Sequence, residues 1–261
     1  AIATVVSQAI SCVLVLRCLY KSEGSYQLRF SKLCLKKDYI IPIFQVGIPA
    51  GIQSTVINFS NVLLQSSVNS FGSIAMAGYT AANNVLGFLY TSVNSVTQAC
   101  MSFTSQNYGA GNLKRCKKIF GLCMLFGIGF TEILSIIFII WDDFFVSIYT
   151  TSAAVAVYGI IRMHHVCLLE GVTATYEVGS ASLRGMGKSI EPSIITILGT
   201  VVFRMIWMVT VFKMVPTYDM LMNVYISSWI FTGGAIFVVY FLHMKKTEAN
   251  AAKKTLCSTS L

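Results

Sequence analysis

The 261-residue sequence is 55% hydrophobic and only 11% charged, whereas about 25% of the residues in soluble domains are charged. A chain this apolar cannot cover itself with polar surface in water, which excludes an ordinary soluble protein. Its net charge of +9 does not require a nucleic-acid partner, because membrane proteins gather Lys and Arg in their cytoplasmic loops. We therefore predict an all-α polytopic membrane protein whose surroundings are the lipid bilayer.

A membrane-spanning helix needs about 20 mostly apolar residues, and seven segments of the chain meet that requirement. We place them at residues 1–19, 41–70, 74–103, 119–141, 154–180, 193–215 and 221–243. The chain starts inside the first apolar run, without an initiator Met and without the basic region and cleavage site of a signal peptide. We therefore expect a fragment whose beginning is missing.

Lys and Arg gather in every second connection between these segments. The other connections are poor in both and include Asp142 and Asp143. Since the excess of Lys and Arg marks cytoplasmic loops, we expect a multi-pass protein of the inner (plasma) membrane of the cell, with its C-terminus in the cytoplasm. The basic residues concerned are Arg17, Lys21, Arg29, Lys32, Lys36, Lys37, Lys114, Arg115, Lys117, Lys118, Arg184, Lys188, Lys245, Lys246, Lys253 and Lys254.

The second and third segments carry more amide and hydroxyl side chains than a helix in lipid needs. In the second segment, Gln53, Asn61 and Gln65 are separated by multiples of four residues, which places them along one stripe of a helix. Such residues either join helices by hydrogen bonds or line a hydrated cavity, and their density in two successive helices favours the cavity. The predicted substrate-cavity residues are Gln53, Asn58, Asn61, Gln65, Tyr79 and Asn83.

Ionisable residues lie inside three later segments. A charge at the centre of a bilayer costs at least a few kcal/mol, so it usually pairs with another charge or faces a cavity. Glu170, Glu177 and Arg184 are seven residues apart, which places them on one helix face, as a proton or cation relay would need. We predict Glu177, Glu170 and Glu132 as cation-coupling residues. The alternative is an internal ion pair between Arg204 and Glu170 or Glu177 that serves assembly only.

Three short motifs stand at the ends of these segments. They are Gly47-Ile48-Pro49-Ala50 in the second, residues 106–115 (QNYGAGNLKR) after the third and residues 182–189 (SLRGMGKS) after the fifth. Together they resemble the multidrug and toxic compound extrusion (MATE) family of cation-coupled exporters. Physically, the glycines at 109, 111, 185 and 187 are suited to tight turns.

The resemblance covers the second half of that family's architecture, in which two six-helix lobes form one transporter. It implies a transmembrane helix at 1–19, a basic cytoplasmic connection at 20–40, a six-helix C-terminal lobe at 41–243 and a basic cytoplasmic tail at 244–261. It also implies a secondary active antiporter that exports amphiphilic or cationic drugs or toxic metabolites in exchange for Na⁺ or H⁺. The expected partners are the small-molecule substrate and a missing N-terminal lobe.

The sequence departs from one branch of the family. Members that couple through this lobe place Glu and Asp at the positions that Ile57 and Thr173 occupy here. Neither residue binds a cation by charge, so coupling either uses Glu177 and Glu170 or resides in the missing lobe.

Two alternatives remain, a lipid-linked oligosaccharide flippase of the same superfamily and a non-transporting membrane scaffold. A flippase would need more Arg and Lys in its cavity than Arg162 and Arg204 provide. We expect no enzyme activity, no catalytic residue, no metal site and no cofactor other than the coupling ion. The eight cysteines are scattered without a Cys-x-x-Cys pair, which is typical of small packing residues.

Overall fold

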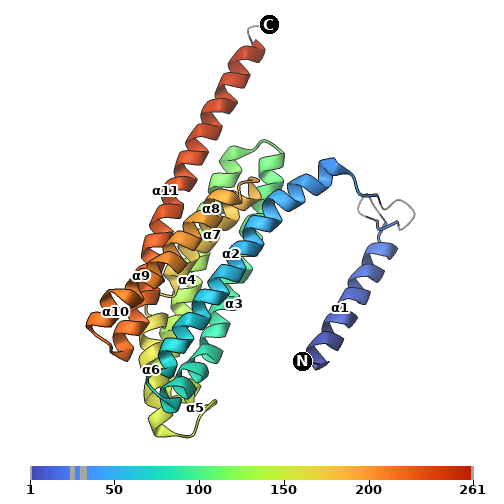
Figure 1. The fold of residues 1–261 in the computed structure, drawn as a ribbon. Helices are drawn as coiled ribbons and strands as arrows, with labels where there is room; N and C mark the ends of the chain where they lie inside the picture. The colour runs from blue at the N-terminus through green and yellow to red at the C-terminus, as the bar shows by residue number, and fades with distance from the viewer. Residues whose placement is uncertain (1, 24–26, 30–33, 260–261) are drawn as a thin grey trace. The chain divides into compact units, whose positions relative to one another are not determined.

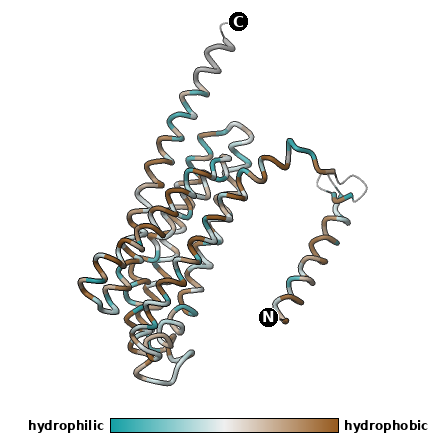
Figure 2. The backbone as a smooth tube through the Cα atoms, in the orientation of Figure 1, coloured by the Kyte–Doolittle hydropathy of each residue, from teal (hydrophilic) through white to brown (hydrophobic). Residues whose placement is uncertain are grey.

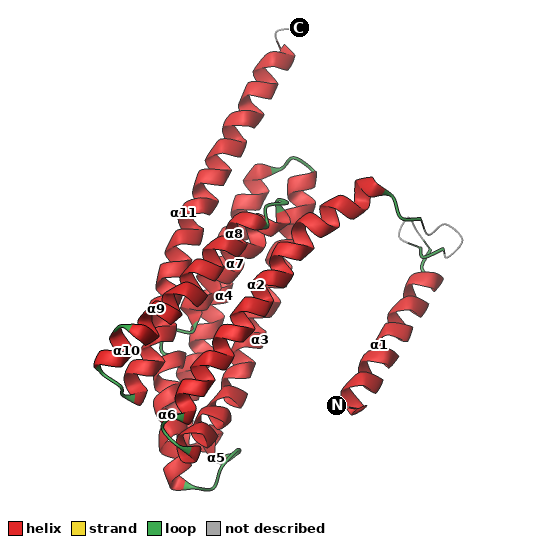
Figure 3. Ribbon diagram, in the orientation of Figure 1, coloured by secondary structure: helices red, strands yellow, loops and turns green. Residues whose placement is uncertain are grey.

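The computed structural model describes residues 2–23, 27–29 and 34–259, so Lys32 of the predicted basic connection lies outside the described residues. The described part of the chain contains helices and no strand, which confirms the predicted all-α fold (Figure 3). The chain divides into two units, Ala1–Ile43 and Phe44–Leu261. The first contains α1 (Ile2–Lys21), an apolar helix with no buried residue, and the start of α2 (Lys37–Asn69).

The second unit is a bundle of helices with α7 in its middle. After α2 come α3 (Ser73–Gly109), α4 (Leu113–Ile140), α5 (Asp142–Ser147), α6 (Ala153–Cys167), α7 (Gly171–Gly185), α8 (Ile190–Thr196), a π-helical segment η2 (Ile197–Val202), α9 (Phe203–Val209), α10 (Val211–Met214) and α11 (Tyr218–Thr259) (Figure 1). Helix α7 packs against α3, α4 and α11. Its surroundings therefore decide what its polar side chains can reach.

Five helices are long and apolar enough to cross a membrane, or six if the bent pair α6 and α7 forms one span. Seven spans are predicted from the sequence. The difference is α3, which has 37 residues and no charge but carries many Asn, Gln, Ser and Thr side chains. Figure 2 shows apolar stretches interspersed with polar residues along the bundle. Helix α4 exposes Leu125, Phe126 and Ile133, as expected for a surface in contact with lipid.

The predicted span at 154–180 is not a single helix, because the chain breaks after Cys167 into α6 and α7, which are bent by 52° and pass as a candidate span only together. Helix α7 starts at Gly171, whose backbone N–H donates a 2.9 Å hydrogen bond to Oε1 of Glu132 on α4. A Cβ at Gly171 would lie 2.7 Å from Cγ of Glu132. The glycine therefore lets the Glu132 side chain approach and satisfy a helix N-terminus inside the bundle.

The predicted sixth span is also irregular. It is divided among α8, η2, α9 and α10, and π-helical turns inside longer helices often occur at functional sites. The last helix runs through Thr259, well beyond the predicted span end at His243, so most of the predicted basic tail is helical.

The glycines of the two turn motifs have different roles. Gly111 and Gly187 adopt positive φ angles of 74° and 78°, a region that glycine reaches without steric cost. Gly185 instead allows close helix approach, since its Cβ would lie 2.8 Å from the carbonyl oxygen of Met101 on α3. Gly109 is helical with open space around it, so the expectation of a tight turn is wrong for Gly109 and Gly185.

Candidate functional site

A cavity of about 490 Å³ opens between α2, α3, α7, the η2–α9 segment and α11, within the range of about 300–1,000 Å³ found for ligand pockets. All its lining residues belong to the second unit. They are Ala50, Gln53, Ser54, Ile57, Asn58, Asn61, Tyr90, Glu170, Thr173, Tyr176, Glu177, Arg184, Thr200, Arg204, Tyr225 and Trp229.

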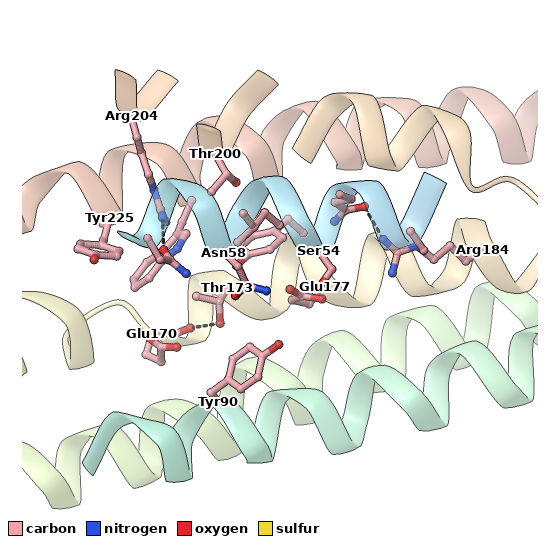
Figure 4. A pocket seen from close by; sticks show the side chains of 16 residues that line it. Ser54, Asn58, Tyr90, Glu170, Thr173, Glu177, Arg184, Thr200, Arg204 and Tyr225 are labelled. Atoms are coloured by element: carbon pink, nitrogen blue, oxygen red, sulfur yellow. Dashed lines mark hydrogen bonds between the residues drawn. The ribbon is translucent and has the colours of Figure 1, made fainter. Parts of the chain in front are cut away.

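Both carboxylates of the predicted relay line this cavity, together with the arginine that follows them (Figure 4). Glu170 precedes the first residue of α7 and is only 6% exposed, whereas Glu177 and Arg184 lie within α7. Their seven-residue spacing keeps all three on the cavity side although the predicted continuous helix is broken. No ion pair within 4.0 Å joins either carboxylate to an arginine in the described ranges, so the alternative of an ion pair with Arg204 is not seen there.

Helix α2 contributes the amide wall of the cavity. Gln53, Asn58 and Asn61 line it, as their predicted role requires, whereas Gln65 does not. Gln53 Oε1 accepts a 2.5 Å hydrogen bond from Nη2 of Arg184, and Asn61 Oδ1 accepts one of 3.1 Å from Nη1 of Arg204.

Tyr79 and Asn83 of α3 lie outside the cavity and join helices. The Tyr79 and Tyr225 hydroxyls are 3.0 Å apart, and Asn83 Oδ1 accepts hydrogen bonds of 3.2 and 2.6 Å from Nε and Nη2 of Arg162. Arg162 also stacks 3.9 Å from the centre of the Tyr79 ring. For these two residues the structure shows interhelical hydrogen bonding, the alternative to cavity lining.

Glu132 is likewise absent from the cavity lining. Its carboxylate is engaged at the start of α7, so its location favours a structural role in holding the bend between α6 and α7.

The cavity also contains residues that were not predicted from the sequence. Tyr225 and Trp229 of α11 are one helical turn apart, and Thr200 of η2 faces the same space. From the sequence alone, two aromatic residues in an apolar segment look the same whether they line a cavity or pack in a core. Ile57 and Thr173, which replace the acidic residues of one MATE branch, also line the cavity.

The side chains that line the cavity supply mainly oxygen atoms and guanidinium groups. Two carboxylates face Asn and Thr oxygens, the type of ligand that hard cations prefer. No group of three or more His, Cys, Asp or Glu side chains suited to a metal was found among the described residues.

Comparison with known proteins gives a consistent result. A family model described as MatE matches residues 49–210, more than half of the chain. The chain is similar to "Probable multidrug resistance protein YoeA" of Bacillus subtilis (strain 168), with 27% identity over 205 residues that cover 76% of this chain and 43% of that protein. It thus spans less than half the length of that curated relative.

Solved structures share the fold. An outward-facing multidrug resistance MATE family transporter of the MOP superfamily matches with a TM-score of 0.80 and 18% identity, over 95% of this chain and 55% of that one. The Vibrio cholerae MATE transporter VcmN in its bent form matches with a TM-score of 0.76 and 16% identity, over 95% and 55% of the two chains.

Proposed function

We propose that this chain, which belongs to the MATE (MatE) family of transporters, works in a secondary active antiporter that exports amphiphilic or cationic compounds in exchange for Na⁺ or H⁺. The observation that carries the proposal is the position of Glu170 and Glu177 in one cavity with Asn58 and Thr173. Carboxylates inside a membrane protein can exchange protons or bind hard cations.

We assign the main coupling role to Glu177 and a supporting role to Glu170. Glu177 lies in the middle of α7 and faces α2, whose amides complete an oxygen-rich wall. A cationic substrate and a coupling cation attracted by the same carboxylates would exclude one another, and that competition is the basis of exchange.

The orientation that we propose places the α3–α4 connection, the α7–α8 connection and the C-terminus in the cytoplasm, with the protein in the plasma membrane. These parts lie at the same end of the bundle (Figure 1). Lys117 Nζ at the start of α4 forms a 2.7 Å ion pair with Glu248 of α11. The clustering of basic residues there agrees with the location of Lys and Arg in cytoplasmic loops.

A companion lobe is the partner that we propose for this chain. Thr80, Asn84, Thr91 and Gln98 are exposed along one face of α3, and a polar stripe of this kind is unfavourable against hydrocarbon. A second lobe across a hydrated cavity would cover it. The flippase alternative is weaker, because Arg184 and Arg204 in the cavity lining are matched by Glu170 and Glu177 and leave no excess of positive charge for a pyrophosphate group.

Binding measurements on the chain in lipid nanodiscs test the proposal. The probe is tetraphenylphosphonium, a permanent amphiphilic cation, and the readout is the fluorescence of Trp229 in the cavity wall. We expect binding to weaken as Na⁺ or H⁺ concentration rises, because ligands that exclude one another show reciprocal coupling.

In Glu177→Gln the competition should disappear, whereas in Glu132→Gln, which changes a carboxyl group outside the cavity, it should persist. Trp229→Phe identifies the signal that comes from the cavity. Tetraphenylphosphonium binding that is independent of both cations would contradict the proposed exchange.

A further inference from the structure

An apolar groove runs along α11, far from the cavity and close to the point where the helix continues beyond the rest of the bundle (Figure 1). It has a volume of about 340 Å³ and is lined by Phe237, Val238, Phe241, Leu242 and Lys245. Their spacing places all five on one face of a helix. Val238, Phe241 and Leu242 are each more than half exposed, so this face points away from the bundle.

One side of the groove is held in place by aromatic packing against α4. The ring of Phe120 stacks on that of Tyr240, with the centroids 3.8 Å apart. The same ring meets Phe237 and Phe241 edge-on, at 5.6 and 6.4 Å. Two rings of the groove are therefore ordered by a neighbouring helix, and an ordered wall loses little conformational freedom when a ligand binds.

The groove ends at a single cationic side chain. Lys245 is exposed and is the one charged residue among the five that line the groove. The carboxylate nearest along the helix, three residues further on, is that of Glu248, which forms a 2.7 Å ion pair with Lys117 of α4 instead. No ion pair in the described residues involves Lys245. The groove thus combines an apolar body with an unpaired ammonium group at one end.

We propose that the groove binds one anionic phospholipid of the cytoplasmic leaflet, with an acyl chain along the apolar residues and the headgroup phosphate at Lys245. In the orientation proposed above, Lys245 lies just beyond the cytoplasmic end of the last span. Acyl chains of every phospholipid fit the apolar part equally, so the lysine selects the headgroup, because basic residues at this level attract anionic lipids. The inference rests on the proposed orientation and adds a lipid site outside the cavity.

Native mass spectrometry of the chain released from detergent micelles tests the site. The probes are phosphatidylglycerol and phosphatidylcholine with identical acyl chains, offered in equal amounts, and the two bound states differ in mass. We expect the first bound lipid to be phosphatidylglycerol about five-fold more often. This ratio corresponds to about 1 kcal/mol, the contribution of one lysine close to anionic headgroups.

Charge variants locate the headgroup. Lys245→Gln should reduce the preference to about two-fold or less, because it removes the charge at the end of the groove. Lys246→Gln is the matched control. It removes the same charge about 100° further around the helix, from a residue that does not line the groove, and should keep the preference.

A second pair of variants locates the acyl chain. Leu242→Ser should weaken the binding of both lipids and leave their ratio unchanged. Leu125→Ser, which alters a similarly exposed leucine of α4 (68% against 63%), should change neither quantity. Because both leucines are exposed, neither substitution removes a buried contact, and circular dichroism verifies that all four variants are folded.

Several results would overturn the site. Equal binding of the two lipids by the wild-type chain removes it, and this comparison needs no variant to fold. A full preference in folded Lys245→Gln, or an equal loss in Lys246→Gln, leaves only diffuse attraction between lysines and anionic lipid. Unchanged lipid binding in Leu242→Ser contradicts the acyl-chain groove. The measurement involves neither the cavity nor transport, so failure of the lipid site leaves the proposed exchange standing, and failure of the exchange leaves the lipid site standing.

Discussion

Replacing Gly78 with alanine should destabilise the bundle, because α3 and α6 approach each other there without room for a side chain. A Cβ at Gly78 would lie 2.5 Å from the carbonyl oxygen of Val155, 2.7 Å from Cβ of Tyr158 and 2.9 Å from the backbone nitrogen of Gly159. Close approach at small residues is a common way for membrane helices to pack.

The size of the effect follows from these distances. Ordinary van der Waals contact begins at 3.4 Å, so the shortest contact is too close by 3.4 − 2.5 = 0.9 Å. Two of the three atoms belong to the backbone of α6 and cannot rotate away, which places the cost near the upper end of the usual overpacking range, about 3 kcal/mol. Alanine has a higher helix propensity than glycine, which offsets about 1 kcal/mol of this cost. The expected net loss is about 2 kcal/mol.

Thermal unfolding of the purified chain in detergent measures this loss. For a chain of this size about 2 kcal/mol corresponds to roughly 4–8 °C in Tm. Gly87→Ala is the matched control, since it lies on the same helix with nothing within 4 Å of the added Cβ, and it should be neutral or stabilising by up to about 1 kcal/mol. If Gly78→Ala unfolds at or above the wild-type temperature, the tight crossing of α3 and α6 is wrong.

Three further predictions concern the bend, the orientation and the coupling. Glu132→Ala should lower the free energy of unfolding by about 1 kcal/mol, because the Gly171 N–H loses its acceptor. Glu132→Gln keeps an acceptor oxygen and should keep most of the wild-type stability. Denaturation in detergent measures both variants. In a cysteine-free background, an impermeant thiol reagent outside intact cells should label a cysteine at Asp143 but not at Lys117, and the reverse pattern would invert the proposed topology. The chain reconstituted alone should give no cation-driven efflux of dye. When a companion lobe is present, Glu177→Gln should insert into the membrane normally but transport less dye per folded molecule. Transport at the wild-type rate by that variant would place coupling elsewhere.

Hydropathy predicted most of the helices but not their interruptions. Apolar runs of sufficient length located the spans to within several residues, because insertion into lipid depends mainly on length and composition. The break between Cys167 and Gly171 contains no proline that would mark it in the sequence. It is stabilised by Glu132 on another helix, and a partner so distant in sequence is not readable from the local pattern.

The sequence correctly predicted those cavity residues whose direction depends only on helical periodicity. Glu170 and Glu177 share a face by spacing, and the structure places both in the cavity. The polar residues of α3 show the limit of that reasoning. Tyr79 and Asn83 differ from cavity residues only in having Tyr225 and Arg162 opposite them, and only the packed structure supplies those neighbours.

Two amides of α2 that face the cavity also bind arginines of other helices. Gln53 accepts from Arg184 and Asn61 accepts from Arg204, while the fully buried apolar contacts of α2 lie further along, at Leu64 and Val68. Removing either amide therefore changes the cavity and also releases a guanidinium donor from its partner. Loss of binding in Asn61→Ala would not distinguish a lost ligand contact from a displaced Arg204. Changes at Glu177, whose carboxylate makes no ion pair within the described residues, isolate the chemistry of the cavity more cleanly than changes in the amides of α2.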